Sequence, residues 1–229
     1  HPGQFLIDVR TPFPLLWINI PYITRLKDSD PEVERITANY PLVNHSRTVP
    51  YHFIHGYRKD LEKKLGVSIE PTEFKGDIHL SEREKTEKRF VDQFGVTGDY
   101  WLIQAGGKLK SWSSKLWHPD YWQDVVDHFK GKITFVQCGT NKPFHFHPKL
   151  NNVIDLIDKE RHLRDYVNLI YHSIGTLSIV TGLHHLNKAV PQKLANHRAL
   201  VTVASGVEPT CWEQYNGQVY LTKSGMMPC

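Results

Sequence analysis

The segment Ser178-Ile-Val-Thr-Gly-Leu-His-His-Leu-Asn-Lys-Ala-Val190 joins two hydrophobic patterns through a short polar turn. The apolar run before Thr181 indicates a buried strand, and Leu183 and Leu186 begin the spacing of one helix face. The segment therefore predicts a strand, a tight turn and a helix, which is the repeating unit of parallel sheets.

The turn at Thr181-Gly182 is a candidate anion site. The first N–H groups of a helix have no partner within it, and the helix dipole favours negative charge there. Thr181 adds a hydroxyl, Gly182 permits close approach of a ligand, and His184 or His185 adds a donor. A phosphate or diphosphate site is one interpretation. An ordinary strand-to-helix turn with two surface histidines is the other.

From about residue 98 onward, predicted strands alternate with predicted helices, which indicates a parallel, doubly wound sheet. The strands are expected at 100–104, 133–137, 153–156, 177–180, 199–203 and 219–221, and the helical segments at 121–129, 163–172, 183–190 and 210–215. Ligands bind such sheets outside the carboxyl ends of the strands. The loops expected to converge there are 105–117, 181–185 and 205–212.

The loop after the first of these strands combines flexible backbone with positive charge. Gly106 and Gly107 are expected to expose N–H groups, and Lys108, Lys110 and Lys115 to neutralise a diphosphate. The spacing is not that of a P-loop. The alternative is a solvated basic loop whose tryptophans pack on the domain.

The loop at 205–212 is a second candidate for nucleotide contact. Gly206 follows a predicted strand, and Glu208 is placed where a carboxylate can accept hydrogen bonds from ribose hydroxyls. The alternative is a turn in which Glu208 caps a short helix that starts at Thr210.

The first third of the chain has a less regular pattern. Buried strands are expected at 5–9 and 40–44, and a helical turn at 15–17. A helix is expected from Tyr51 to Leu65, with Gly66 as its stop signal. Ser81-Glu-Arg-Glu84 is a capping box that predicts a further helix reaching Phe94.

The amino-acid composition indicates a globular protein without a membrane span. The chain has 229 residues, 40% of them hydrophobic and 23% charged, as expected of a globular protein with a sizeable core. We expect no membrane span, because no apolar run approaches about 20 residues. We also expect no secretory signal, because His1-Pro2-Gly3 has neither a basic region nor an apolar one. The three cysteines form no disulfide framework, so we expect a reducing, cytoplasmic location.

The three loops together resemble the C-terminal half of glycosyltransferase family 9, enzymes that transfer heptose from ADP-heptose. Lys115-Leu-Trp117 is similar to the Lys-x-Trp element of that family. Thr181-Gly182 with His185-Leu186 is similar to its Thr-Gly-x-x-His-Leu element, and 206–209 to its last loop. Further phrases, such as Trp212-Glu213, are most similar to the autotransporter heptosyltransferase subgroup.

The resemblance implies a GT-B type α/β fold. A partial N-terminal α/β domain on the acceptor side would span 1–76, a connecting helix 77–97, and a Rossmann-like nucleotide-sugar domain 98–229. It implies an ADP-sugar donor, no required cofactor, and a lipopolysaccharide-core or protein hydroxyl as acceptor. Self-association is compatible with it. The implied donor-binding residues are Gly106, Gly107, Lys115, Thr181, Gly182, His185, Gly206 and Glu208.

The chain departs from the family pattern in two places. Val180 stands where many members have Asp, and the first strand and Gly-rich loop of the family have no counterpart before His1. We therefore expect a chain trimmed at both ends or a protein that lost them. The subgroup continues into a cysteine-rich segment of which Cys229 would be the first residue, so no metal site is assigned apart from that cysteine.

Inverting transfer requires a base for the acceptor and positive groups for the leaving diphosphate. Lys115 and the Thr181-Gly182 turn are the candidates for the leaving group. Asp8, near the end of the first predicted strand, is the only early carboxylate in a plausible position for the base. A buried structural Asp is the alternative for that residue.

Two other functions stay open at this stage. A non-catalytic nucleotide-sugar-binding or assembly module would keep the donor cleft without the base. A nucleic-acid-binding protein would use the tryptophans and lysines of the first loop to stack and neutralise a single strand. The net charge of +4 suits an anionic small ligand and does not require nucleic acid, so we expect no nucleic-acid partner.

Overall fold

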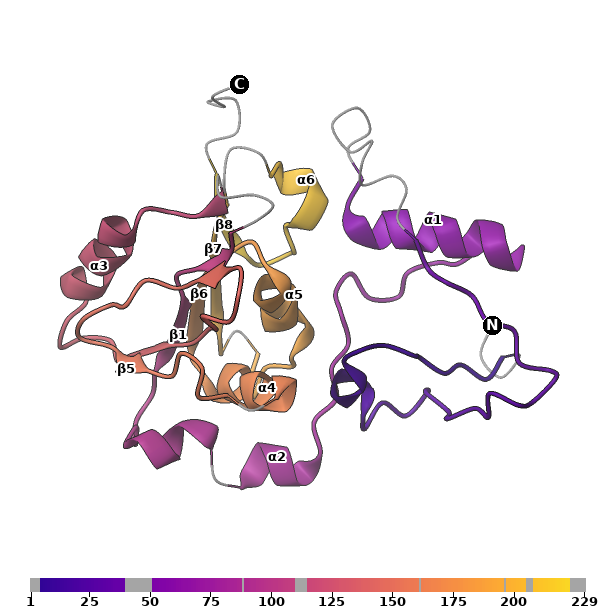
Figure 1. Cartoon of the computed structure of the whole chain (residues 1–229), viewed down its shortest axis with the longest axis horizontal. Coiled ribbons are helices and arrows are strands. Elements are labelled where there is room, and N and C mark those ends of the chain that lie inside the picture. The colour runs from indigo at the N-terminus through magenta and orange to yellow at the C-terminus, as the bar shows by residue number, and fades with distance from the viewer. Residues whose placement is uncertain are drawn as a thin grey trace.

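The computed structural model describes residues 5–39, 51–87, 89–109, 115–160, 162–195, 197–204 and 208–222. It has an α/β fold in which helices pack against a parallel sheet, with the N-terminal part of the chain beside this sheet domain (Figure 1).

The main sheet has six strands in the order β5-β3-β1-β6-β7-β8, and every neighbouring pair is parallel. This confirms the doubly wound sheet predicted from residue 98 onward. The strands are β1 (Trp101–Gln104), β3 (Phe135–Gln137), β5 (Ile154–Asp155), β6 (Gly175–Ile179), β7 (Ala199–Val203) and β8 (Val219–Leu221).

Both faces of the sheet are covered, which explains why its central strands are apolar almost throughout. On one face Leu102 and Val136 pack with Val167 and Ile170 of the helix Leu163–His172 (α4) and with part of the helix Gly182–Ala189 (α5). The other face packs against the helix Pro119–His128 (α3), whose Trp122 is fully buried. Helix α4 occupies the predicted range.

A small two-stranded sheet lies beside the main one. Strand β2 (Gly107–Lys108) pairs in antiparallel fashion with β4 (His145–Phe146). Two-residue strands show too little alternation to be predicted, so both segments were expected as loops.

The helix predicted to run from the capping box to Phe94 is wrong beyond its first turn and a half. The capping box is present, but α2 spans only Glu82–Thr86, and a separate 3₁₀-helix covers Phe90–Phe94. The Phe90 amide donates instead to Asn168 Oδ1 of α4 at 2.7 Å, and the Arg89 amide to Asp92. Because these side chains take the amide donors, the helix cannot continue.

The buried strand predicted at 5–9 is also wrong. Phe5, Leu6 and Ile7 are more than half exposed, and in the described N-terminal residues the strand pairing is one isolated bridge between Ile7 and Ile23. The strand expected at 40–44 lies outside the described residues. The helical turn is present as a 3₁₀-helix, Pro14–Trp17.

Helix α1 (Phe53–Leu65) brings the N-terminal part against the sheet domain. His52 caps its first turn, and Gly66 ends it with φ +65° in the left-handed region, as predicted. Phe53 stacks on Trp212 of the short helix α6 (Thr210–Glu213), with ring centroids 6.2 Å apart. This contact joins segments about 160 residues apart in the sequence.

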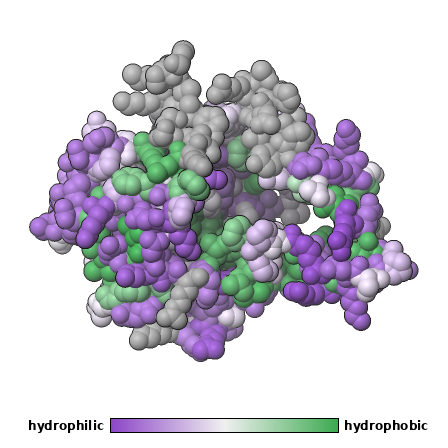
Figure 2. All heavy atoms as spheres, viewed as in Figure 1, coloured by the Kyte–Doolittle hydropathy of each residue, from purple (hydrophilic) through white to green (hydrophobic). Residues whose placement is uncertain are grey.

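Hydrophilic and hydrophobic residues are interspersed over the visible face (Figure 2). Within the described ranges, no helix has both the length and the apolar character needed to cross a membrane.

Candidate functional site

The direction of chain progression through the sheet reverses between β1 and β6, which is where parallel sheets form a ligand crevice. From β1 the chain passes through α3 to β3 and β5 on one side, and then returns through α4 to β6 on the other side of β1. At such a reversal the loops after the two neighbouring strands turn away from each other, which leaves a ligand site at their carboxyl ends. The loops that border it are those after Gln104 and after Ile179.

One hydrogen bond crosses the base of this crevice. The Thr181 hydroxyl donates to Gln104 Oε1 at 3.0 Å, joining the segment after β6 to the end of β1. Thr181 is the N-cap residue of α5, but its side chain makes no cap bond to the helix. The first amides of α5 are therefore without a side-chain acceptor from their own cap residue, which suits an anionic ligand. Gln104 was not predicted, although a polar residue ending a buried strand before Gly-Gly is a usable signal.

The three predicted glycines that the structure describes have different surroundings. Gly106 packs so closely on the backbone of Phe146 and His147 that a Cβ atom would overlap it. At Gly107 a Cβ would lie 3.1 Å from Ile179 Cδ1 and 3.3 Å from Thr181 Cγ2. At Gly182, the first residue of α5, a Cβ would meet no described atom within 4 Å. Gly106 thus allows β4 to pack closely beside it, whereas among the described residues nothing fills the space next to Gly182.

Lys115 and Glu208 form an ion pair, which brings the first and third candidate loops together. The Glu208 side chain is 3% exposed and that of Lys115 is 26% exposed. Burial raises the pKa of Glu208 above its ordinary value, and Lys115 partly opposes this shift. The second carboxylate oxygen of Glu208 is buried and has no hydrogen-bond partner among the described residues.

Glu213, at the end of α6, is a site residue that was not predicted. It is buried, and burial together with the Glu208 carboxylate raises its pKa to about 7, although Lys115 acts in the opposite direction. The ammonium group of Lys115 thus partly compensates the charge of two buried carboxylates, those of Glu208 and Glu213. Any anion that draws Lys115 away from them would leave both less compensated.

His184 and His185 have structural contacts. His184 is fully buried: Nδ1 lies 2.9 Å from Thr202 Oγ1, and Nε2 lies 2.8 Å from the Glu213 carbonyl oxygen, to which it can donate. The burial of His184 therefore excludes the interpretation of this residue as a surface histidine. His185 is partly buried, and its Nδ1 lies 2.7 Å from the Tyr215 hydroxyl. Burial lowers the pKa of His184 to about 4 and that of His185 to about 3, so both rings are neutral at pH 7.

These buried rings predict a loss of stability in acid. Four histidines keep folded-state pKa values near 3 to 4, against about 6.5 when unfolded, so between pH 6.5 and 4 the unfolded chain binds more protons and stability falls. Glu160 and Glu213, with pKa values raised to about 7, oppose this trend because their folded forms bind protons more tightly, and Glu208, whose pKa is also raised, acts in the same direction. The four histidines outweigh these carboxyls. They are His52, His147, His184 and His185.

We expect the free energy of unfolding to drop by on the order of 2 kcal/mol or more from pH 7 to pH 5. Urea unfolding at several pH values measures this change. A His184→Gln variant should show a shallower decline, because one neutral buried ring is removed. A free energy that is constant or higher at pH 5 would contradict the expectation.

Asp8 lies in the N-terminal part, away from the strand ends that form the crevice. Its carboxylate accepts from the Leu26 amide at 3.1 Å and from the Val9 amide at 2.8 Å, and it pairs with Arg10. The Leu26 amide is the largest influence that lowers the pKa of Asp8. A carboxylate held in this way is a weak base. Gly206, Lys110 and Cys229 lie outside the described residues, and in the described ranges no three His, Cys, Asp or Glu side chains gather as metal ligands would.

Solved structures with a similar fold are glycosyltransferases. A glycosyl transferase of family 9 from Veillonella parvula superposes with a TM-score of 0.54 at 16% identity, over 75% of this chain and 48% of that one. The iron-containing dodecameric glycosyltransferase TibC from enterotoxigenic E. coli gives 0.51 at 18% identity, over 76% and 40%. The chain thus spans less than half of each protein. No protein-family model and no curated protein matches the sequence.

Proposed function

We propose that this chain is part of a glycosyltransferase that binds an ADP-sugar, with heptose or a related sugar, and transfers the sugar to a hydroxyl of a lipopolysaccharide core or a protein. The observation that carries the proposal is the crevice between β1 and β6, where the uncapped first turn of α5 lies beside open space at Gly182. The fold shared with two solved glycosyltransferases supports it.

In this proposal the diphosphate of the donor would accept hydrogen bonds from the first amides of α5. Lys115 would turn from Glu208 toward the departing diphosphate, where its charge stabilises the negative charge that develops as the sugar leaves. Glu208, with one oxygen unpaired among the described residues, would accept from ribose hydroxyls. His185 would border the same first turn of α5, as a neutral ring.

We further propose that no cofactor is required, that the protein is located in the cytoplasm, and that the most similar subgroup is that of the autotransporter heptosyltransferases. TibC, a structural neighbour, is dodecameric, which supports self-association of this chain.

A second candidate is a module that binds a nucleotide-sugar without transferring it. The bonding of Asp8 favours this alternative, because both of its carboxylate oxygens have partners and its pKa is lowered. Release of ADP from ADP-heptose in the presence of an acceptor distinguishes the two functions. An enzyme releases ADP at a rate that depends on acceptor concentration, whereas the module binds the donor without releasing it.

The donor site is tested by calorimetric titration with ADP and ADP-heptose. We expect Lys115→Ala to weaken binding of both ligands at least about tenfold, which is about 1.4 kcal/mol. Lys132→Ala is the matched control, because it removes the same charge before β3, at the opposite end of the sheet, and should leave affinity unchanged. Equal affinity of the parent and Lys115→Ala, or binding of neither ligand by the parent chain, would contradict the proposed site.

A further inference from the structure

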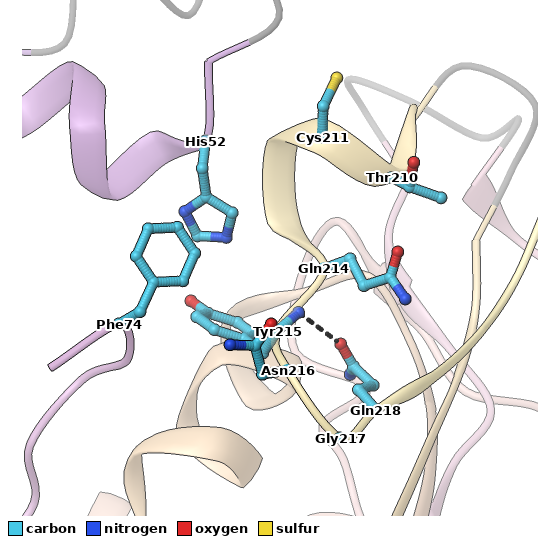
Figure 3. A pocket seen from close by; sticks show the side chains of 9 residues that line it. All are labelled: His52, Phe74, Thr210, Cys211, Gln214, Tyr215, Asn216, Gly217 and Gln218. Atoms are coloured by element: carbon cyan, nitrogen blue, oxygen red, sulfur yellow. Dashed lines mark hydrogen bonds between the residues drawn. The ribbon is translucent and has the colours of Figure 1, made fainter.

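A second hollow lies between the two parts of the chain, next to the crevice (Figure 3). Its volume is about 430 Å³, within the range of small-molecule sites. His52 and Phe74 form one wall, and the other comes from α6 and the turn before β8. The residues of that second wall are Thr210, Cys211, Gln214, Tyr215, Asn216, Gly217 and Gln218.

The chemistry of the lining disfavours an anionic ligand. None of the nine lining residues carries a fixed charge, and burial lowers the pKa of His52 to about 4, so its imidazole is neutral. A carboxylate or phosphate placed there would lose its hydration without gaining a cation. An uncharged ligand avoids this cost.

The polar groups of the pocket also exclude a purely apolar ligand. Gln214 and Asn216 place carboxamides at its border, each with a carbonyl acceptor and an NH₂ donor. Gln218 is already occupied, because its Oε1 accepts from the Tyr215 amide at 3.1 Å and its Nε2 lies 2.7 Å from Thr202 Oγ1. The Gln218 side chain is thus held in place by its partners, whereas the carboxamides of Gln214 and Asn216 can adapt to a ligand.

Two aromatic rings face this polar rim. Phe74 lies 4.5 Å from the His52 ring, and the Tyr215 ring lies 5.1 Å from the same imidazole, measured between centroids. An uncharged sugar ring matches this combination, because one of its faces presents C–H groups and its edge presents hydroxyls that both donate and accept. Asn216 and Gly217 are exposed, so the pocket opens to solvent and a longer chain can leave it.

Two features connect the wall of the pocket to residues of the proposed donor crevice. The hydroxyl of Tyr215 is hydrogen-bonded to His185 in the first turns of α5, and Thr210 follows Glu208 by two residues. We propose that this pocket binds an uncharged sugar unit of the acceptor. The role as acceptor site rests on the proposed glycosyltransferase function, whereas the preference for an uncharged sugar rests on the pocket alone.

Saturation-transfer NMR on the whole chain tests the proposal. The probes are methyl glycosides of glucose, galactose, mannose and a heptose, with methyl glucuronide as the charged comparison. At least one neutral glycoside should bind, and the glucuronide at least about fivefold more weakly than the best of them. A Gln214→Ala/Asn216→Ala variant should lower affinity at least about fivefold, because two rim amides are removed. Asn151→Ala, an exposed amide outside the pocket, is the matched control and should bind like the parent.

Five outcomes would overturn the proposal. No neutral glycoside binds, the double variant binds them as the parent does, or the glucuronide binds equally well. Competition by ADP would also overturn it, because the pocket would then belong to the donor, and so would preferential binding of a serine-containing peptide. Titration with ADP on the same samples separates the two hypotheses: ADP binding without sugar binding leaves the donor site intact and removes only this pocket.

Discussion

Replacing Arg198 with alanine should destabilise the fold by at least about 3 kcal/mol. The side chain is 3% exposed, and its guanidinium donates to four backbone carbonyl oxygens. These are the oxygens of Ile170 at the end of α4 and of Asn187, Val190 and Pro191 around the end of α5. Its positive charge faces the negative ends of both helix dipoles. Alanine would leave several buried carbonyls unsatisfied and a cavity beside them.

Urea unfolding followed by circular dichroism measures this loss. Arg198→Lys should be intermediate, because it keeps the charge but cannot reach as many carbonyls. Arg83→Ala is the control at an exposed ion pair with Glu87 and should cost less than about 1 kcal/mol. A loss of less than about 1 kcal/mol for Arg198→Ala would mean that the helix ends find other donors.

The second large effect is expected from a pair of glycine substitutions at the crevice. Gly106→Ala should lower stability by about 3 kcal/mol, because its Cβ would overlap the backbone of Phe146 and His147, which cannot move like a flexible side chain. Gly182→Ala should leave stability unchanged or slightly higher, since it adds a helix-favouring residue in open space.

Gly182→Ala, the variant expected to keep its stability, should be the one with weaker ADP binding. Because we place the diphosphate at the first turn of α5, which Gly182 begins, an added methyl group there should hinder the ligand, and we expect ADP affinity to fall at least about tenfold in a fully folded protein. Thermal unfolding and calorimetry on both variants measure the two properties. Unchanged ADP affinity in Gly182→Ala would place the ligand elsewhere.

The sheet domain could be predicted from the sequence because its elements are set by local patterns. The apolar runs at β1, β6 and β7 and the helical face of α4 are each visible in a window of ten residues. The end of α1 was likewise predictable, because Gly66 readily adopts the left-handed conformation found there. Local propensity and tertiary structure agree at these positions.

The predictions failed where a distant side chain decides the structure. Asn168, 78 residues away, takes the Phe90 amide and interrupts the expected helix. The sequence suggested ligands for Lys115 and Glu208 separately, but their pairing depends on how two loops close over the strand ends. The same holds for the pocket, since His52 meets Tyr215 only through the packing of α1 against α6.

Because the Thr181 hydroxyl donates to Gln104, the Thr181 side chain does not cap the first turn of α5. A threonine that capped its own helix would contribute about 1 kcal/mol to stability, whereas this one links the segment after β6 to the end of β1 and gives the first amides of α5 no side-chain acceptor. An anion bound there would accept hydrogen bonds from the first amides of α5 and so take the place of the missing side-chain cap. Occupancy of the crevice and order in the first turn of α5 would then rise and fall together, so the ligand would act as a missing part of the secondary structure.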